Sequence, residues 1–431
     1  MTRDGVKVSV MPITESEKRR KIAALFGSIM SEDIIIDSNG SGEAERCRAA
    51  MRHCQRWAYE KGEIAFSHIT TSESQGYGLL MTAYAEGCGL ELPATTRERG
   101  FGSLRVLFNA LLRAALAFPS AKTGDKRLMA WQLFGYGERG GDKTGYGEKG
   151  GVKTAPFWVN KKRGGCATDG DMDIIFALLA AQKLWGEGGE YNYGALARER
   201  LGGLWERCVH ERLRVLLAGD WAKGAEGVMG SAVRLSDIMP EHIKAFAAAD
   251  SRHDWASVAD ASYNVISCLC ERNPAPTGLL PDFAVRRGNS WVAPEGKVLE
   301  ADDGAYSYNA CRAPWRLGAD YLRHGDTPLP NGSLWETVIK PLHCFSERAA
   351  GGDPERLGPM RLDGAAAGAA DPDVFAAPFL VTAACMPGGG GRWGEALWSW
   401  RGSGEYNGDN YGDYLKLLSM MTAAGYSVSP F

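Results

Sequence analysis

The sequence predicts an all-α fold in a single domain spanning residues 1–431. About a dozen stretches repeat their apolar residues at the three-to-four-residue spacing of an amphipathic helix. No convincing run alternates apolar and polar residues as a half-buried strand does. No linker rich in Pro, Gly or Ser stands out, and 431 residues are enough to bury one large core. Consecutive helical hairpins that close into a toroid would satisfy this number of helices.

The apolar period defines the segments in which we expect helices. Besides the one that follows Ser72, the predicted helices span residues 16–31, 43–61, 104–118, 167–185, 193–217, 240–249, 253–272, 307–322, 334–347, 374–386 and 411–424. The segment 135–153 (GYGERGGDKTGYGEKGGVK) differs because it is rich in glycine and nearly free of aliphatic residues. We expect it to form a long surface loop or a hairpin.

Composition excludes several classes of function. The net charge of −3 gives no reason to expect a nucleic acid or a membrane surface as partner. No apolar run reaches the ~18 residues of a transmembrane helix. The basic cluster 18–21 precedes an apolar run that is short and lacks a cleavage site, so we interpret it as a helix start. The 10 cysteines and 7 histidines show no metal-ligand spacing, so we expect free buried thiols and no metal or cofactor.

A carboxylate stands at the start of one predicted helix, in the stretch TTSESQGYGLLMTAYAE at residues 70–86. Ser72 is a suitable N-cap, and Gly76 and Gly78 allow close packing of the backbone. Glu73 would then lie at the helix mouth with its stem against apolar neighbours. Partial burial raises the pKa of a carboxyl, which suits a general acid at neutral pH. The alternative is an ordinary first-turn glutamate that interacts with the helix dipole.

A second group of carboxylates precedes the apolar helix predicted at 167–185, ATDGDMDIIFALLAAQKLW. Asp169 is the first of its three aspartates. Aspartate at a helix N-terminus commonly acts as a cap, and this is the alternative to a role in chemistry.

Three stretches resemble glycoside hydrolase family 8, in the order in which that family has them. The pattern S-E-x-Q-x-Y-G-x-L-M around Glu73 is similar to the motif around the family's proton donor. The pattern A-T-D-G-D-x-x-I around Asp169 is similar to the second family signature. The stretch YNACRAPWR is similar to Y-[DN]-A-x-R-x-P-W-R, with Arg312 and Trp315 at the matching positions.

The resemblance implies an (α/α)6 barrel and an inverting hydrolase of β-1,4-linked polysaccharide that needs no metal or cofactor. By the same resemblance, Glu73 is the general acid, and Asp169 holds the sugar at the point of cleavage. The stretch RLSDIMPEHIKAF at 234–246 resembles the chitosanase and mixed-linkage glucanase members of the family, through S-D-x-M-x-x-H.

The general base is the point at which the chain departs from the cellulase branch. An inverting glycosidase needs a second carboxyl about 6.5–9.5 Å from its acid. The cellulase branch has an aspartate where this chain has Asn309, and an amide cannot serve as a base. In the chitosanase-type branch an asparagine stands there and a loop glutamate is the base, and LEADDGAYSYNACRAPWR resembles that branch. We therefore expect Glu300 to be the base, with Asp302 and Asp303 as alternatives.

Aromatic rings and polar groups near these motifs are candidates for sugar contacts, because a sugar ring has an apolar face and hydroxyl-rich edges. The predicted substrate-binding residues are Trp131, Tyr308, Asn309, Arg312, Trp315, Asp302 and Asp303, with Tyr406 as a further candidate. Each aromatic ring could instead belong to the core.

The sequence thus predicts a secreted, monomeric endo-β-1,4-glycanase whose partner is a polysaccharide. Chitosan is the favoured substrate, with or without activity on β-glucan. One alternative is a β-1,4- or mixed-linkage glucanase without chitosan activity. Another is a catalytically silent glycan-binding protein, or a disabled enzyme, which Asn309 motivates. One or two polar contacts in each subsite choose between a 2-amino and a 2-hydroxyl sugar, so the sequence leaves the substrate open.

Overall fold

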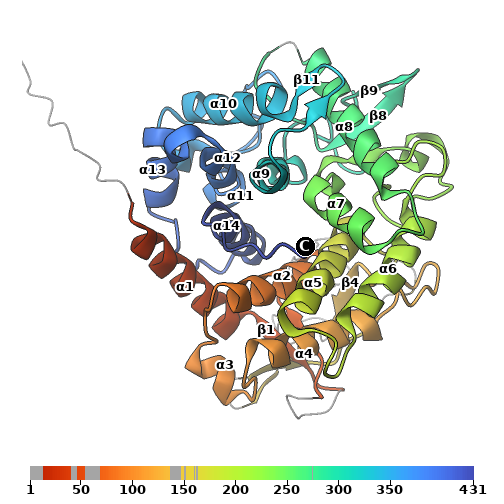
Figure 1. The fold of residues 1–431 in the computed structure, drawn as a ribbon, viewed down its shortest axis with the longest axis vertical. Helices are drawn as coiled ribbons and strands as arrows, with labels where there is room; N and C mark the ends of the chain where they lie inside the picture. Colours follow the sequence, from red (N-terminus) through yellow and green to blue (C-terminus); the bar gives the residue numbers. More distant parts are fainter. Residues whose placement is uncertain are drawn as a thin grey trace, which may run out of the picture.

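The helices of the computed structural model form two concentric rings (Figure 1). The structure describes residues 13–39, 46–53, 68–135, 147–149, 152–159, 161, 164–273 and 275–431. The inner ring consists of α2 (Ser72–Gly87), α5 (Thr168–Trp185), α7 (Pro240–Ala249), α9 (Ala313–His324), α12 (Phe379–Cys385) and α14 (Asn410–Ala423). Each inner helix contacts the next, and α14 returns to α2, so the ring is closed.

The outer ring covers the inner one. It consists of α1 (Glu15–Glu32), α4 (Leu104–Ala117), α6 (Tyr193–Cys208), α8 (Trp255–Arg272), α10 (Lys340–Ala350) and α13 (Gly391–Ser399). Helix α4 packs on α2, α6 on α5, α8 on α7, α10 and α13 on α12, and α1 on α14. This alternation of inner and outer helices is the (α/α)6 barrel, so the predicted fold class is confirmed.

Short elements decorate the barrel. Two further helices are α3 (Ala94–Glu98) and α11 (Pro372–Phe375). The described strands form four small sheets: β1 (Ile34–Asp37), β2 (Ala49–Met51), β5 (Gly147–Lys149) and β6 (Val152–Ala155); β3 (His68–Thr71) with β4 (Gln132–Phe134); β7 (Val233–Arg234), β8 (Phe283–Arg287) and β9 (Ser290–Val292); and β10 (Pro328–Leu329) with β11 (Gly332–Ser333). Most of them lie in loops between helices, where they fix the paths of the connections.

Glycines let α2 and α5 approach each other closely. A Cβ atom at Gly170 would lie 2.5 Å from the carbonyl carbon of Ser72 and 2.7 Å from the amide nitrogen of Glu73. A Cβ atom at Gly76 would lie 2.7 Å from that of Asp173. Separations this short are not tolerated, so any other residue would push the two helices apart. The glycines therefore bring the first turns of α2 and α5 into contact.

The helix predictions hold at most positions, and four differ for local reasons. Within 43–61 the structure has strand β2, and residues 43–45 and 54–61 lie outside the described part. The helix predicted at 193–217 ends at Cys208. Pro378 lacks an amide hydrogen and separates α11 from α12 within 374–386. The segment 334–347 starts with a π-helical turn, Trp335–Ile339, ahead of α10.

Helix α13 had not been predicted, whereas a hairpin was one of the two forms expected within 135–153. Helix α13 was missed because its sequence, GRWGEALWS, contains two glycines. Of the glycine-rich segment 135–153, the structure describes residue 135, β5 and the start of β6, and these two strands pair as an antiparallel hairpin. The remainder of that segment lies outside the described residues.

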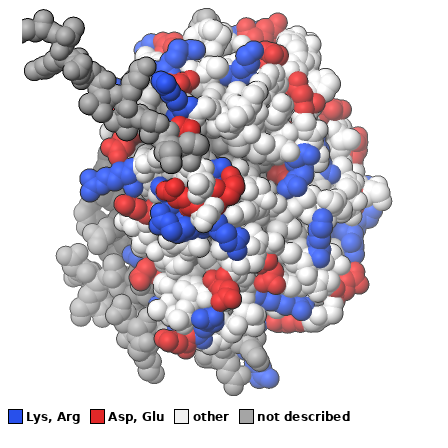
Figure 2. Space-filling model, turned by 60° about the vertical axis from the view of Figure 1, so that its left-hand side comes forward, with Lys and Arg blue, Asp and Glu red and all other residues white. Residues whose placement is uncertain are grey.

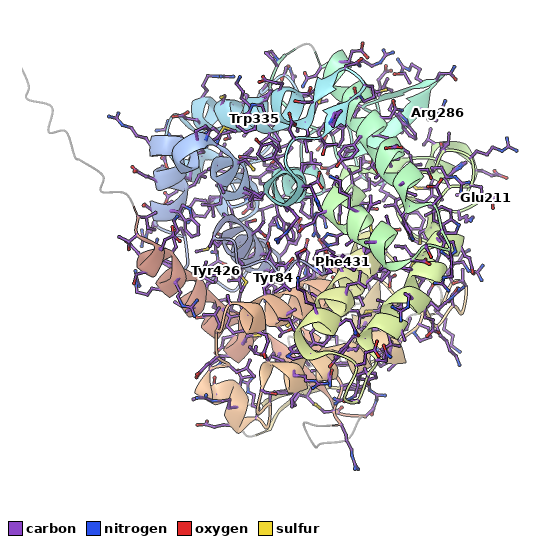
Figure 3. All side chains as sticks on the ribbon, viewed as in Figure 1. Tyr84, Glu211, Arg286, Trp335, Tyr426 and Phe431 are labelled. Atoms are coloured by element: carbon purple, nitrogen blue, oxygen red, sulfur yellow. The ribbon has the colours of Figure 1, made fainter. Side chains whose placement is uncertain are left out.

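The C-terminal tail closes one end of the ring. Figure 3 places Phe431 and Tyr84 near the centre of the barrel in this view. The Ser427 carbonyl accepts a hydrogen bond from Arg323 at the end of α9, at 3.1 Å, and Val428 lies against Gly87 at the end of α2. The tail thus lies over the carboxyl ends of α9 and α2, and the site lies at the amino ends of the inner helices.

Surface charges, thiols and helix apolarity can be compared with the composition within the described residues. On the face drawn in Figure 2, basic and acidic side chains are interspersed. The described cysteines are free thiols, but only Cys47, Cys166, Cys208 and Cys311 are buried as predicted, and the other five are half-buried. No helix in the described part of the chain has the length and apolarity to cross a bilayer.

Candidate active site

The candidate site lies where the amino ends of the inner helices converge. Glu73 is in the first turn of α2 and Asp169 in the first turn of α5. Arg312 immediately precedes α9, and Tyr411 is in the first turn of α14. Helix amino termini carry a partial positive charge, which stabilises carboxylates placed among them.

Glu73 is recessed, with 17% of its side chain exposed. Its Oε1 accepts a hydrogen bond from the Tyr77 hydroxyl one turn later, at 2.8 Å, and another from Arg312. Burial raises the pKa of Glu73; Arg312 opposes this effect and the nearby Asp169 adds to it. The helix N-cap is Thr71, whose hydroxyl accepts from the Ser74 amide at 3.2 Å, and not Ser72 as predicted.

Asp169 is buried between two guanidinium groups. Its Oδ1 accepts from Arg234 at 2.7 Å, and its Oδ2 accepts from Arg312 at 3.0 Å. Burial alone would raise the pKa of Asp169, but the two arginines outweigh it and hold the pKa below its usual range. Asp169 therefore stays ionised at neutral pH, whereas burial makes Glu73 hold its proton more tightly than an exposed glutamate would.

The other two aspartates of α5 have structural partners of their own. Asp171 forms a buried ion pair with Arg200 at 2.6 Å. Asp173 pairs with Arg316 at 2.6 Å and with His242 at 2.9 Å. Only Asp169 of the three connects to Glu73.

Asn309 is held at both ends of its amide. Its Nδ2 donates to Asp282 Oδ2 at 3.2 Å, and its Oδ1 accepts from Arg312 at 3.2 Å. Asp282 Oδ1 also accepts from the backbone amides of Ser307, Asn309 and Ala310, at 3.0, 3.1 and 2.6 Å. Burial raises the pKa of Asp282 to about 6 against these hydrogen bonds. The Asn309 amide thus bridges Asp282 and Arg312 and fixes the position of the Arg312 guanidinium relative to Asp282.

Asp303 organises the acidic loop from within. Its Oδ2 accepts from three consecutive backbone amides, those of Val298, Leu299 and Glu300, at 2.7, 2.6 and 2.9 Å. Its side chain is buried. The prediction that Asp303 contacts the sugar or serves as the base is wrong, because its carboxylate faces the loop. Glu300 and Asp302 are exposed on the same loop, and their roles stay predictions.

The predicted aromatic platforms divide into exposed and buried rings. Trp131 is 37% exposed, and its carbonyl accepts from the Ser72 amide at 2.8 Å, so it adjoins Glu73. Tyr308 is 48% exposed. Trp315 is only 3% exposed and donates to the Thr422 hydroxyl at 3.0 Å, so the prediction that it stacks on a sugar is wrong.

The structure adds residues that the sequence argument had not placed in the site. Arg234 links Asp169 to Asp237, which is fully buried and accepts from Arg234 Nε at 2.8 Å. The Tyr411 ring lies 5.9 Å from the Arg312 guanidinium, and its hydroxyl donates to the Tyr308 carbonyl at 2.8 Å. Arg234 and Asp237 belong to the RLSDIM stretch. Two charged residues in this apolar context were the signal in the sequence that could have indicated buried site residues. Tyr406 is half-buried and donates to Asp33 at 2.9 Å.

No group of three or more His, Cys, Asp or Glu side chains in the described part of the chain is arranged to hold a metal ion. The arrangement is instead one of carboxylates with different proton affinities beside exposed aromatic rings. Such pairs of carboxyl groups are the means by which glycosidases combine acid and base catalysis.

Comparisons with known proteins agree with this chemistry. The model of the family described as glycosyl hydrolases family 8 matches residues 151–328. A beta-glucanase of Niallia circulans is 32% identical over 358 residues, covering 83% of this chain and 76% of that protein. An endoglucanase of Bacillus sp. (strain KSM-330) is 26% identical over 379 residues, covering 85% of this chain and 70% of that protein.

Solved structures share the fold. The apo structure of a beta-1,3-1,4-glucanase from Paenibacillus sp. X4 has a TM-score of 0.75 and 28% identity, covering 96% of this chain and 93% of that one. A cold-adapted family 8 xylanase has a TM-score of 0.68 at 16% identity, covering 99% and 96%, which shows the shared fold alone. The chain therefore belongs to glycoside hydrolase family 8 and is an endo-acting glycoside hydrolase.

Proposed function

We propose that the protein is an inverting endo-β-glucanase that cleaves mixed-linkage β-1,3-1,4-glucan. The observation that carries the proposal is the pair of carboxyls, Glu73 and Asp169, that share Arg312 beside the exposed ring of Trp131. The choice of substrate is supported by the names of the relatives that cover most of the chain, a beta-glucanase and a beta-1,3-1,4-glucanase. The S-D-x-M-x-x-H stretch supports the same branch.

Glu73 acts as general acid in this proposal. Both hydrogen bonds that it makes with described residues end on Oε1, so Oε2 is the oxygen that carries the proton to the glycosidic oxygen. Tyr77 and Arg312 fix the plane of the carboxyl group. Its raised pKa keeps it protonated closer to neutral pH than an exposed glutamate.

Asp169 supplies a fixed negative charge next to the acid. The transition state resembles an oxocarbenium ion, so an ionised carboxylate at the cleavage point stabilises it. The two arginines keep Asp169 ionised and hold its position. Asp169 also positions the sugar at the cleavage point in this proposal, as the sequence predicts.

Glu300 acts as the base that deprotonates the attacking water. It is exposed on a loop whose backbone Asp303 holds through three amides, which limits how far the carboxylate can move. Asn309 has both ends of its amide bound within the protein, so its role is to orient Arg312.

Trp131 and Tyr308 provide the exposed aromatic faces on which glucose rings stack. The substrate is the expected partner, and no part of the reaction requires a cofactor. We propose, as the sequence predicts, that the enzyme is monomeric and secreted.

Chitosan is a second candidate substrate, favoured by the carboxylates near Tyr308. The Tyr308 hydroxyl donates to Asp371 Oδ2 at 3.2 Å. Burial raises the pKa of Asp371, and the neighbouring Asp409 raises it further, so a cation placed here would relieve their repulsion. The ammonium group of a glucosamine unit is such a cation.

Release of reducing ends from lichenan, carboxymethyl cellulose, chitosan and xylan tests the proposal. We expect the highest rate on lichenan and a loss of about 10²–10⁴-fold in the Glu73→Gln variant, since general acid catalysis contributes that much. A higher rate on chitosan than on lichenan would mean that chitosan, and not mixed-linkage glucan, is the substrate. Retention of lichenan on an affinity gel without cleavage of any polymer would overturn the proposal in favour of a glycan-binding protein.

A further inference from the structure

Five charged groups alternate in sign through the site; Arg312, Asp169 and Asp237 are buried, and Glu73 and Arg234 are partly exposed. We name Glu73, Arg312, Asp169, Arg234 and Asp237 the ion row. Each member contacts the next. Glu73 pairs closely with Arg312, and the following three separations along the row are 3.0 Å (Arg312 to Asp169), 2.7 Å (Asp169 to Arg234) and 2.8 Å (Arg234 to Asp237). The row begins at the proposed acid and ends at Asp237, which has no surface exposed.

The row carries more negative than positive groups. Three carboxyls against two guanidiniums leave one negative charge in excess when all five groups are ionised. Burial of an unpaired charge is costly, so one proton is retained on a carboxyl. Asp169, between both arginines, is the member that loses its proton most easily, which leaves the two ends, Glu73 and Asp237.

Asp237 is only partly satisfied. Its Oδ1 accepts from Arg234 and, at 3.2 Å, from the Ser236 hydroxyl. Its Oδ2 is buried and accepts no hydrogen bond from any described residue. Burial raises the pKa of Asp237 to about 7, with Arg234 acting against this rise and Asp169 adding to it.

We propose that Asp237 is a positioning residue that holds the proton on Glu73, acting through the rest of the ion row. Ionised Asp237 draws Arg234 toward itself and leaves Asp169 with more of its negative charge. That charge raises the affinity of Glu73 for its proton. The proposal rests on the role of Glu73 as general acid.

One further titratable group, Asp282, reaches the ion row through Asn309 and Arg312, and it is the same in every variant described below. The turn Leu235–Asp237 packs against α5, the turn Ala310–Arg312 and α9, and its Leu235 amide donates to the carbonyl of Asp282 at 2.9 Å. These three elements present Asp169, Arg312 and Arg316, and the last is held by Asp173. Glu73 is faced further by Tyr77 and Tyr411, whose pKa values burial raises well above 10, so both remain neutral.

The pH dependence of kcat/KM reports the acid in the free enzyme, so the alkaline limb measures loss of the Glu73 proton. In the wild type, Asp237 ionises as pH rises through about 7, and its negative charge then raises the affinity of Glu73 for its proton. The alkaline limb therefore extends to higher pH and falls less steeply than a single ionisation would. In Asp237→Asn this negative charge is absent, so the pKa of Glu73 falls. We expect the limb to move to lower pH, on the order of one unit, and to steepen to a single ionisation.

A second variant covers the case in which Asp237→Asn does not fold. Ser236→Ala removes one donor to ionised Asp237 and little packing, so Asp237 stays protonated to higher pH. The limb should move in the same direction by a smaller amount. The matched control is Asp320→Asn, a buried carboxyl that pairs with Lys244 at 2.7 Å outside the row and should leave the limb unchanged.

Two outcomes separate failure of this inference from failure of the proposed function. If Glu73→Gln is inactive while Asp237→Asn and Ser236→Ala keep the wild-type limb, Asp237 does not act on the acid and the inference is overturned. If Glu73→Gln keeps both the rate and the limb on lichenan, Glu73 is not the acid and the proposed mechanism fails with it.

Discussion

Arg312 connects three side chains with one planar guanidinium. Its Nη1 donates to both Glu73 and Asp169, and its Nη2 donates to Asn309. A lysine has one compact donor group and could not span these acceptors with the same geometry. At the scale of the residue, the site therefore depends on the several N–H donors of the Arg312 guanidinium, whose orientation the amide of Asn309 fixes.

The contact between Asn309 and Asp282 predicts the behaviour of Asn309→Asp. The new carboxyl would stand where the amide donates to Asp282 at 3.2 Å, so two carboxyls would share one site. Near pH 5 they can share a proton, but above the pKa of Asp282, about 6, they repel each other. We expect the variant to lose about 1–3 kcal/mol of unfolding free energy at pH 8 and less at pH 5.

Urea unfolding at the two pH values measures this difference, and Asn309→Ser serves as a control without a new charge. No gain of activity is expected in Asn309→Asp, because Glu300 is the base in the proposed mechanism. A rate increase of orders of magnitude would show that Glu300 is a surface charge and that the wild type lacks its base.

The acidic loop depends on Asp303 at the scale of the element. Without this carboxylate, three consecutive amides lose their acceptor and the loop that carries Glu300 loses its fixed path. We expect Asp303→Ala to lower kcat on the order of 10²-fold, since a misplacement of ~1 Å can cost that much. The melting temperature should change little, because the barrel helices are not involved.

Glu295→Ala is the matched control, because Glu295 is exposed on the same loop and pairs only with the exposed Arg287 among described residues. Limited proteolysis should cut Asp303→Ala faster within 294–304 than either the control or the wild type. An Asp303→Ala variant with normal kcat and normal resistance would show that the loop keeps its path without the carboxylate.

Helix positions could be predicted from sequence because apolar periodicity is a local property. The expected segment 16–31 is α1, and 240–249 is α7 residue for residue. The strand β2 within 43–61 was missed because its pairing with β1 is a long-range contact that competes with local helical spacing. The N-cap of α2 was predicted one residue late, at Ser72 instead of Thr71. This error is local, because the backbone angles of a single residue decide where a helix begins.

At the scale of the whole molecule, the motifs placed Glu73, Asp169 and Arg312 together, and the structure brings all three into contact. Sequence could not show that Trp315 packs inside the barrel or that Asp303 faces its own loop, because burial is a property of the assembled fold. Arg234, Asp237 and Asp282 were missed for the same reason, since only the closed ring brings their charges to the acid.

The ring also explains how distant segments form one site. The first turns of α2, α5 and α14 and the residue before α9 meet at one end of the barrel, while the C-terminal tail lies at the carboxyl ends of α9 and α2. Gly170 allows α2 and α5 to touch at that end. In the proposed mechanism, Glu73 and Glu300 act from opposite sides of a sugar bound at this end of the barrel.

The anomeric configuration of the first products tests this account most directly. In the proposed reaction, water attacks from the face opposite the leaving group that Glu73 protonates, so each cleavage inverts the configuration. Proton NMR during the first minutes of lichenan hydrolysis should show the α-anomer of the new reducing end before mutarotation produces the β-anomer. Initial appearance of the β-anomer would contradict the account, because it requires a covalent intermediate and two displacements.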